Sequence, residues 1–171
     1  MRRTRGLVLL GMALAAAALF AWWRLAPDLA FADPAVADTA GRLAFAAQWL
    51  LVPGFTLIVG IGAAANRRFF VPDAIDGNPE TGNRALDINL RYNRNTLEQT
   101  VLAAIAWIGL ALVLPEARLA LIPELAIAFA IGRALFWLGY LAAPWARAFG
   151  FALTFYPTVA AYIWLALRAL R

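Results

Sequence analysis

Five long apolar stretches dominate this sequence and restrict what it can fold into. They are between 17 and 25 residues long. Because a helix rises about 1.5 Å per residue, such lengths match a hydrocarbon core about 30 Å thick. None alternates apolar and polar residues as a membrane barrel strand does. The sequence therefore predicts five transmembrane helices, over Leu7–Trp23, Leu43–Ala65, Leu97–Leu114, Leu119–Ala143 and Phe149–Leu167.

The composition supports a membrane protein and excludes several kinds of chemistry. Hydrophobic residues make up 64% of the chain and charged residues only 15%, whereas soluble domains average about 45–50% and about 25%. The chain has neither Cys nor His, and every basic residue is Arg. The side chains therefore offer no disulfide, thiol nucleophile, His general base or Lys Schiff base, and we expect no metal site.

Arginine residues flank the apolar stretches unevenly. With the N-terminus inside, nine Arg lie in the inner flanks and five in the outer flanks. Because cytoplasmic flanks carry the excess of basic residues, this bias predicts a cytoplasmic N-terminus and a cytoplasmic segment Asn66–Thr96. The net charge of +5 thus reflects membrane topology and not a nucleic-acid partner. The richness in Arg and Ala favours a bacterial protein, which we expect in the inner membrane.

The first apolar stretch has two interpretations. It resembles a signal peptide, because Arg2–Arg5 precede it and Ala30-Phe31-Ala32 offers a small-residue cleavage site. Arg24 and Asp28, however, separate the apolar run from that site, which favours a retained transmembrane helix. We therefore divide the chain into an N-terminal helix or signal-like segment at 1–32 and a four-helix membrane domain at 43–171.

The longest polar segment, Asn66–Thr96, changes character part-way along. It begins with turn-forming residues from Pro72 to Gly82. From about Arg84 these residues stop, so helix can run unbroken from there into the third span.

Glu98 and Arg133 carry charges inside apolar spans, where charges are costly and often functional. At 100° per residue, Arg91, Asn95 and Glu98 share one face of the third span. Arg133, Phe136, Tyr140 and Arg147 share a face if the fourth helix continues through Arg147. One Glu among several Arg predicts a positive pocket suited to a ligand with carboxylates. The alternative is a purely structural interhelical salt bridge between Glu98 and Arg133.

Two stretches resemble the MAPEG family, the membrane-associated proteins in eicosanoid and glutathione metabolism. Arg91-Tyr92-Asn93-Arg94-Asn95-Thr96-Leu97-Glu98 is similar to the Arg-x-x-x-Asn-x-x-Glu signature that opens the family's second core helix. Gly132–Tyr140, followed by Arg147, is similar to its third core helix. Arg67 and Arg68 stand where the family has a basic pair. The resemblance covers about Leu43–Leu167 and makes the first stretch an addition to a four-helix bundle.

The resemblance implies an all-α, homotrimeric membrane glutathione transferase or peroxidase with its active site toward the cytoplasm. Glutathione would be the thiol co-substrate and a lipophilic electrophile or hydroperoxide the second substrate. Arg147 would stabilise the glutathione thiolate, a shift of about two pKa units worth roughly 2.7 kcal/mol. The residues that would bind glutathione are Arg91, Asn95, Glu98, Arg133, Tyr140, Arg67 and Arg68.

Three residues depart from the family pattern and keep other functions open. Phe136 replaces a Tyr common in glutathione-binding members, Gln99 replaces a Tyr found in some, and Pro144 interrupts the approach to Arg147. The first alternative is therefore a MAPEG-fold protein that binds or scaffolds without catalysis. The second is a small oligomeric transporter that uses Glu98 and Arg133 along an ion path.

Overall fold

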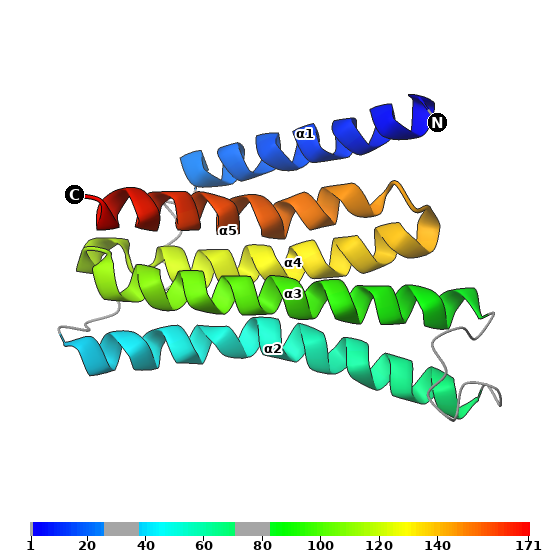
Figure 1. Cartoon of the computed structure of the whole chain (residues 1–171), viewed down its shortest axis with the longest axis horizontal. Coiled ribbons are helices and arrows are strands. Elements are labelled where there is room, and N and C mark those ends of the chain that lie inside the picture. Colours follow the sequence, from blue (N-terminus) through cyan, green and yellow to red (C-terminus); the bar gives the residue numbers. More distant parts are fainter. Residues whose placement is uncertain (1, 26–37, 71–82) are drawn as a thin grey trace.

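A computed structural model describes residues 2–25, 38–70 and 83–171, which form an elongated bundle of helices (Figure 1). Consecutive helices run in opposite directions. Helix α2 therefore lies antiparallel to α3 at one side of the bundle, and α1 lies parallel to α5 at the other. Helix α3 also contacts α4 and α5, which places it inside the bundle. The helices are α1 (Arg2–Leu25), α2 (Thr39–Phe69), α3 (Arg84–Val113), the short 3-10 helix η3 (Glu116–Arg118), α4 (Leu121–Ala142) and α5 (Arg147–Ala169).

The five long helices confirm the five predicted spans. Each is long and apolar enough to cross a membrane. On α2, for example, Leu51, Phe55 and Ile58 are between 65% and 70% exposed. Side chains of this kind would be unfavourable against water and are stable against lipid tails. The chain is therefore an integral membrane protein.

Helix α3 begins where the sequence predicted, at Arg84. The Asn83 side chain caps it, accepting hydrogen bonds from the backbone N–H groups of Ala85 and Leu86, both at 3.1 Å. The turn-forming residues Pro72–Gly82 and the possible cleavage site at Ala30–Ala32 lie outside the described residues.

Glycines allow the closest approaches between helices. A Cβ at Gly60 would overlap Tyr92 and Asn93, so the absent side chain lets α2 press against α3. A Cβ at Gly150 would overlap backbone atoms of α4, including Phe136 N and Gly132 O. Gly62, by contrast, faces open space, so close helix packing explains the presence of glycine at position 60 but not at position 62.

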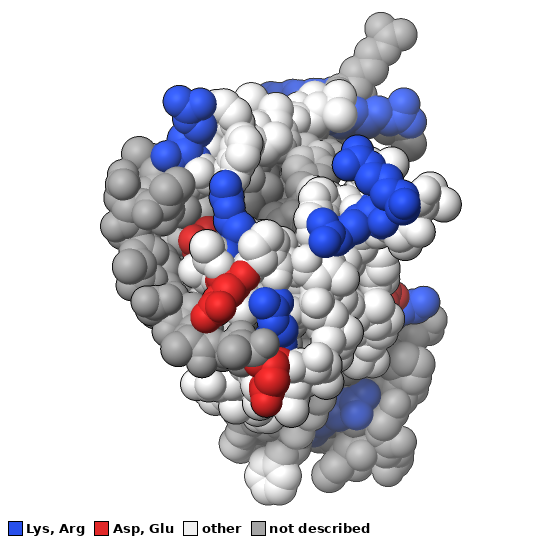
Figure 2. Space-filling view, turned by 90° about the vertical axis from the view of Figure 1, so that its left-hand side faces the viewer, with Lys and Arg blue, Asp and Glu red and all other residues white. Residues whose placement is uncertain are grey.

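The two ends of the bundle carry different numbers of Arg. One end of the bundle contains the start of α1, the end of α2, the start of α3 and the turn between α4 and α5 (Figure 1). These segments bear the nine inner-flank Arg. Figure 2 shows the opposite end, where basic and acidic side chains both reach the surface. There Arg42 donates hydrogen bonds to the carbonyls of Ala111 and Leu114 at 3.0 and 2.6 Å, which closes the C-terminal end of α3.

Candidate functional site

A cavity of about 550 Å³ lies between α1, α3, α4 and α5, toward the Arg-rich end. Its volume falls within the range of about 300–1,000 Å³ that is typical of small-molecule sites. Polar and charged side chains come mostly from α3, and apolar ones from the other three helices and the turn between α4 and α5. The lining residues are Val8, Met12, Arg91, Arg94, Asn95, Glu98, Phe136, Tyr140, Pro144, Trp145, Arg147, Ala148 and Phe151.

The polar wall of the cavity is one face of α3. Arg91, Arg94, Asn95 and Glu98 follow one another at intervals of three, one and three residues, which keeps them on one side of the helix. Arg94 Nε lies 3.4 Å from Glu98 Oε1, and both side chains are largely exposed. An ion pair this exposed contributes little to stability. Both side chains are therefore available to a ligand.

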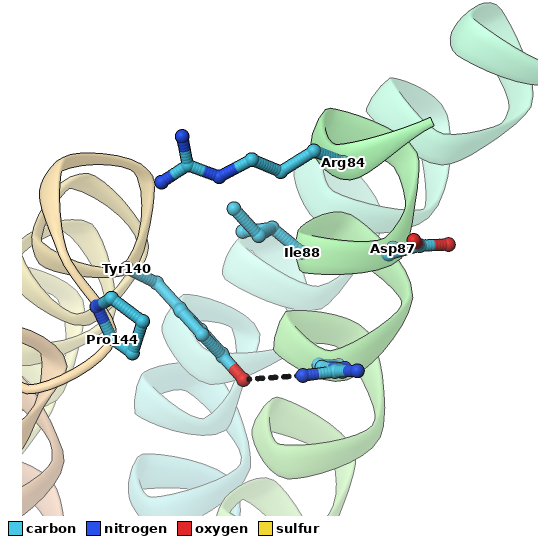
Figure 3. A pocket seen from close by; sticks show the side chains of 6 residues that line it. Arg84, Asp87, Ile88, Tyr140 and Pro144 are labelled. Carbon is cyan, nitrogen blue, oxygen red and sulfur yellow. Dashed lines mark hydrogen bonds between the residues drawn. The ribbon is translucent and has the colours of Figure 1, made fainter. Parts of the chain in front are cut away.

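Tyr140 of α4 stands between two Arg side chains. The Arg91 Nη1 donates a hydrogen bond of 3.3 Å to the Tyr140 hydroxyl (Figure 3). The guanidinium carbon of Arg147 lies 4.5 Å from the centre of the Tyr140 ring, a favourable cation–π distance. Arg91, Tyr140 and Arg147, which come from three helices, therefore meet at one edge of the cavity.

The expectation that Arg147 continues the face of the fourth helix is wrong. Helix α4 ends at Ala142, and Arg147 is the first residue of α5. Ala143 is extended (φ −158°, ψ 146°) because Pro144 disfavours helical backbone in the residue before it. The turn closes with the Ala146 N–H donating to the Ala143 carbonyl at 3.0 Å. This reversal, and not helical periodicity, returns Arg147 to Tyr140.

Arg133 lies inside the bundle, behind the cavity wall. It is 0% exposed, and its Nη1 and Nη2 donate hydrogen bonds of 2.8 Å to Asn95 Oδ1 and Thr154 Oγ1. Its guanidinium carbon also lies 4.5 Å from the centre of the Phe136 ring. Arg133 thus ties α3, α4 and α5 together and fixes the orientation of the Asn95 amide.

The interhelical salt bridge between Glu98 and Arg133 does not form. Glu98 pairs with Arg94 on its own helix, and Arg133 takes an amide and a hydroxyl as partners. The structural alternative based on that ion pair is therefore wrong. Glu98 lines the cavity, whereas Arg133 does not.

Arg67 and Arg68 lie apart from the other predicted site residues. They occupy the last turn of α2, and neither lines the cavity of about 550 Å³ or its smaller neighbour. The Nε of Arg68 is buried without a hydrogen-bond partner within the described part of the chain. A single chain therefore brings together Arg91, Asn95, Glu98, Tyr140 and Arg147, with Arg133 bonded to Asn95.

A second cavity of about 230 Å³ extends the site toward the end of the bundle. It shares Arg91, Tyr140 and Pro144 with the larger cavity. In Figure 3 the Arg84 side chain reaches across from α3, and its Nη2 donates to the Leu141 carbonyl at 3.3 Å, whereas Asp87 points away. This extension adds one cation, Arg84, and one carboxylate, Asp87, to the lining and so leaves the net charge of the site unchanged.

Several lining residues were not anticipated from the sequence. Arg94 lies within the α3 signature and could have been identified from its position one turn after Arg91. Val8, Met12, Trp145 and Phe151 look like ordinary apolar residues of membrane helices. Only the packing of their helices reveals that they face the cavity.

The comparisons with known proteins agree with the geometry. The model of the MAPEG family matches residues 43–167, which run from the first turns of α2 almost to the end of α5. No curated protein and no solved structure matches the chain. Helix α1 lies outside the matched range, but the cavity residues of α3, α4 and α5 lie within it. Because the match covers most of the sequence and includes the polar face of α3, the chain belongs to the MAPEG family.

Proposed function

We propose that this protein is a membrane-bound glutathione transferase or peroxidase that activates the glutathione thiolate for attack on lipophilic electrophiles or hydroperoxides. The observation that carries the proposal is the convergence of the α3 signature with Tyr140 and Arg147 around one cavity. MAPEG membership supports it, since the family includes glutathione transferases as well as non-catalytic members.

The charges of the cavity fit glutathione. Arg91, Arg94 and Arg147 line it together with one carboxylate, that of Glu98. Glutathione carries two carboxylates and one ammonium group. Glu98 is suited to accept the ammonium, and the guanidinium groups of Arg91 and its neighbours to donate to the carboxylates. The Asn95 amide, oriented by Arg133, offers a further polar contact.

Arg147 is the residue proposed to act on the sulfur. Glutathione supplies the thiol, which a chain without Cys does not contain. Arg147 is exposed in the described chain, and its guanidinium lies against the Tyr140 ring. Phe136 and Phe151 line the same cavity, and a lipophilic substrate that fills it would exclude water and so strengthen the attraction between a cation and a thiolate. Lowering a thiol pKa from about 8.5 to about 6.5 requires about 2.7 kcal/mol, within reach of one such contact.

The remaining predicted site residues fit roles beyond direct contact within one protomer. Arg133 is proposed as a positioning residue that acts through Asn95. Arg67 and Arg68 are proposed to reach the cavity of a neighbouring subunit in a homotrimer, because in their own protomer they line neither cavity. We further propose that the Arg-rich end faces the cytoplasm of a bacterial inner membrane, as the distribution of Arg favours.

A binding protein without catalysis is the second candidate. Phe136 lines the cavity where glutathione-binding relatives usually have Tyr, so the site lacks one hydroxyl. Gln99 is 97% buried but lies outside the cavity lining, so its departure from the family pattern leaves the site unaltered. The distinction between the two candidates therefore depends on whether the bound thiol ionises.

Glutathione binding to the detergent-solubilised protein, measured by isothermal titration calorimetry, tests the proposal. We expect Glu98→Gln to weaken binding about tenfold, because it removes a charge-assisted hydrogen bond worth about 1.5–3 kcal/mol. Glu116→Gln is the matched control, since Glu116 lies in η3 at the opposite end. Wild-type protein that does not bind at millimolar glutathione would contradict the glutathione assignment.

A further inference from the structure

Helix α1 contributes part of the cavity although it lies outside the family match. Val8 and Met12, one helical turn apart, line the same cavity as Arg91, Arg94, Asn95 and Glu98 of α3. The family match begins at residue 43. One wall of the site is therefore formed by a segment that the four-helix family core does not include.

Small residues hold α1 against α5. A Cβ added at Gly11 would lie 3.4 Å from Phe149 N and 3.5 Å from Ala148 Cβ, so the two helices approach closely there. Ala15 is 0% exposed and packs with Ala152 and Leu153. This contact is continuous with Met12, which packs against the same cluster. The α1 wall is therefore positioned by packing on α5 between Gly11 and Leu19, and the two helices lie side by side in Figure 1.

The other face of α1 is exposed. Leu9, Leu10 and Leu14 are 65%, 54% and 53% exposed, as expected for side chains that face lipid tails. At 100° per residue, Val8, Gly11, Met12 and Ala15 share the opposite face. The helix thus separates lipid on one side from the cavity on the other.

The cavity has two chemically different walls. The α3 wall carries Arg91, Arg94, Asn95 and Glu98, while Val8 and Met12 of α1 continue an apolar surface formed with Phe136, Trp145 and Phe151. A ligand that fills the cavity must therefore be charged on one side and apolar on the other. Met is well suited to such a surface because its unbranched thioether adapts to differently shaped partners.

We propose that Val8 and Met12 form the subsite for the apolar chain of the lipophilic co-substrate and set the chain length that the enzyme accepts. This inference rests on the proposed function, which places the thiol of glutathione between the two walls. Shortening the Met12 side chain lengthens the subsite, and a larger side chain at Val8 or Met12 closes it. The charged wall of α3 remains unaltered in either case.

Binding of S-methylglutathione and S-decylglutathione to the purified full-length protein in nanodiscs tests this proposal. In the wild type we expect the decyl compound to bind at least about tenfold more tightly, because burial of each methylene contributes up to about 0.8 kcal/mol. In Met12→Trp the ratio of the two affinities falls below about threefold. Met12→Ala retains the preference, which shows that the site is intact when the side chain is shortened.

Leu9→Trp is the matched control, since it adds the same bulk on the exposed face of α1. It should leave both affinities unchanged. An undiminished preference for the decyl compound in Met12→Trp would overturn the proposal, as would an intact-mass measurement showing that mature protein lacks α1. A failure of the glutathione assignment looks different, because S-methylglutathione then binds to no variant.

A cysteine substitution decides the α1 proposal independently of glutathione. The chain has no Cys, so Met12→Cys and Leu9→Cys each carry a single thiol. We expect decanoic acid to slow modification of Met12→Cys by N-ethylmaleimide at least fivefold and to leave Leu9→Cys unchanged. Equal rates with and without decanoic acid at Met12→Cys would contradict an apolar subsite on α1.

Discussion

The two ends of the bundle use their Arg side chains differently. At the end away from the cavity, Arg42 closes the C-terminal end of α3, and Arg168 lies over the Trp164 ring at 5.6 Å. At the cavity end, Arg147 lies over Tyr140 in the same kind of contact at 4.5 Å. There, however, Arg91 and Arg94 line the same cavity as Arg147. An Arg placed against an aromatic ring is therefore no sign of a site by itself, and the convergence of several cations on one cavity is.

A substitution at the close contact between α4 and α5 is expected to have the largest effect on stability at the cavity end. Gly150→Ala forces backbone atoms of the two helices apart, since Phe136 N and Gly132 O would overlap the new Cβ. We expect a loss of about 3 kcal/mol in the free energy of unfolding, measured in mixed detergent micelles. Glutathione binding should fall as well, because Arg147 begins the displaced helix.

Gly62→Ala is the matched control for Gly150→Ala. Gly62 lies in a helix with open space around its Cα, so the substitution should be neutral or stabilise by up to about 1 kcal/mol. Equal effects of Gly150→Ala and Gly62→Ala would contradict the close packing that places Arg147.

Arg42→Gln should separate stability from binding at the opposite end. The substitution removes the hydrogen bonds to the Ala111 and Leu114 carbonyls, and hydrogen bonds from charged groups are worth about 1.5–3 kcal/mol each. We expect about 2 kcal/mol less stability, measured by the same unfolding titration, because the Gln amide can still donate one of the two hydrogen bonds. The affinity for glutathione should not change, and a large loss of affinity would show that the two ends are coupled.

Phe136→Tyr should give the smallest effect and the only gain in glutathione affinity. The ring is 4% exposed and lines the cavity, so a hydroxyl restores the donor that glutathione-binding relatives carry at this position. One hydrogen bond is worth about 0.5–1.5 kcal/mol, which predicts about threefold to tenfold tighter glutathione binding by calorimetry. A weaker affinity would mean that the hydroxyl points away from the ligand.

Local rules were sufficient to predict much of this architecture. The apolar stretches gave all five long helices, and the end of the turn-forming residues placed the start of α3 at Arg84. Helical periodicity placed Arg91, Asn95 and Glu98 on one face, and the structure puts all three in the cavity lining. These features depend on residues close together in the sequence, so the sequence pattern contains them.

Features that depend on contacts between distant helices could not be predicted. The partner of Arg133 on α5 is Thr154, which nothing in the sequence pattern distinguishes from other Thr residues. Arg147 reaches Tyr140 through a chain reversal at Pro144 and not through a continued helix. The approach of Val8 and Met12 requires packing of the first helix on the last, which a periodicity argument within one helix does not address.

The ionisation of bound glutathione tests the central claim most directly. Ultraviolet difference absorbance of the glutathione complex reports the thiolate, with Arg168→Ala as the matched control because it removes an Arg–aromatic contact far from the cavity. We expect a thiolate near neutral pH in the wild type and in Arg168→Ala. In Arg147→Ala the apparent thiol pKa should rise by about two units. Glutathione that binds without forming a thiolate in the wild type, or a thiolate unchanged in Arg147→Ala, would contradict this claim.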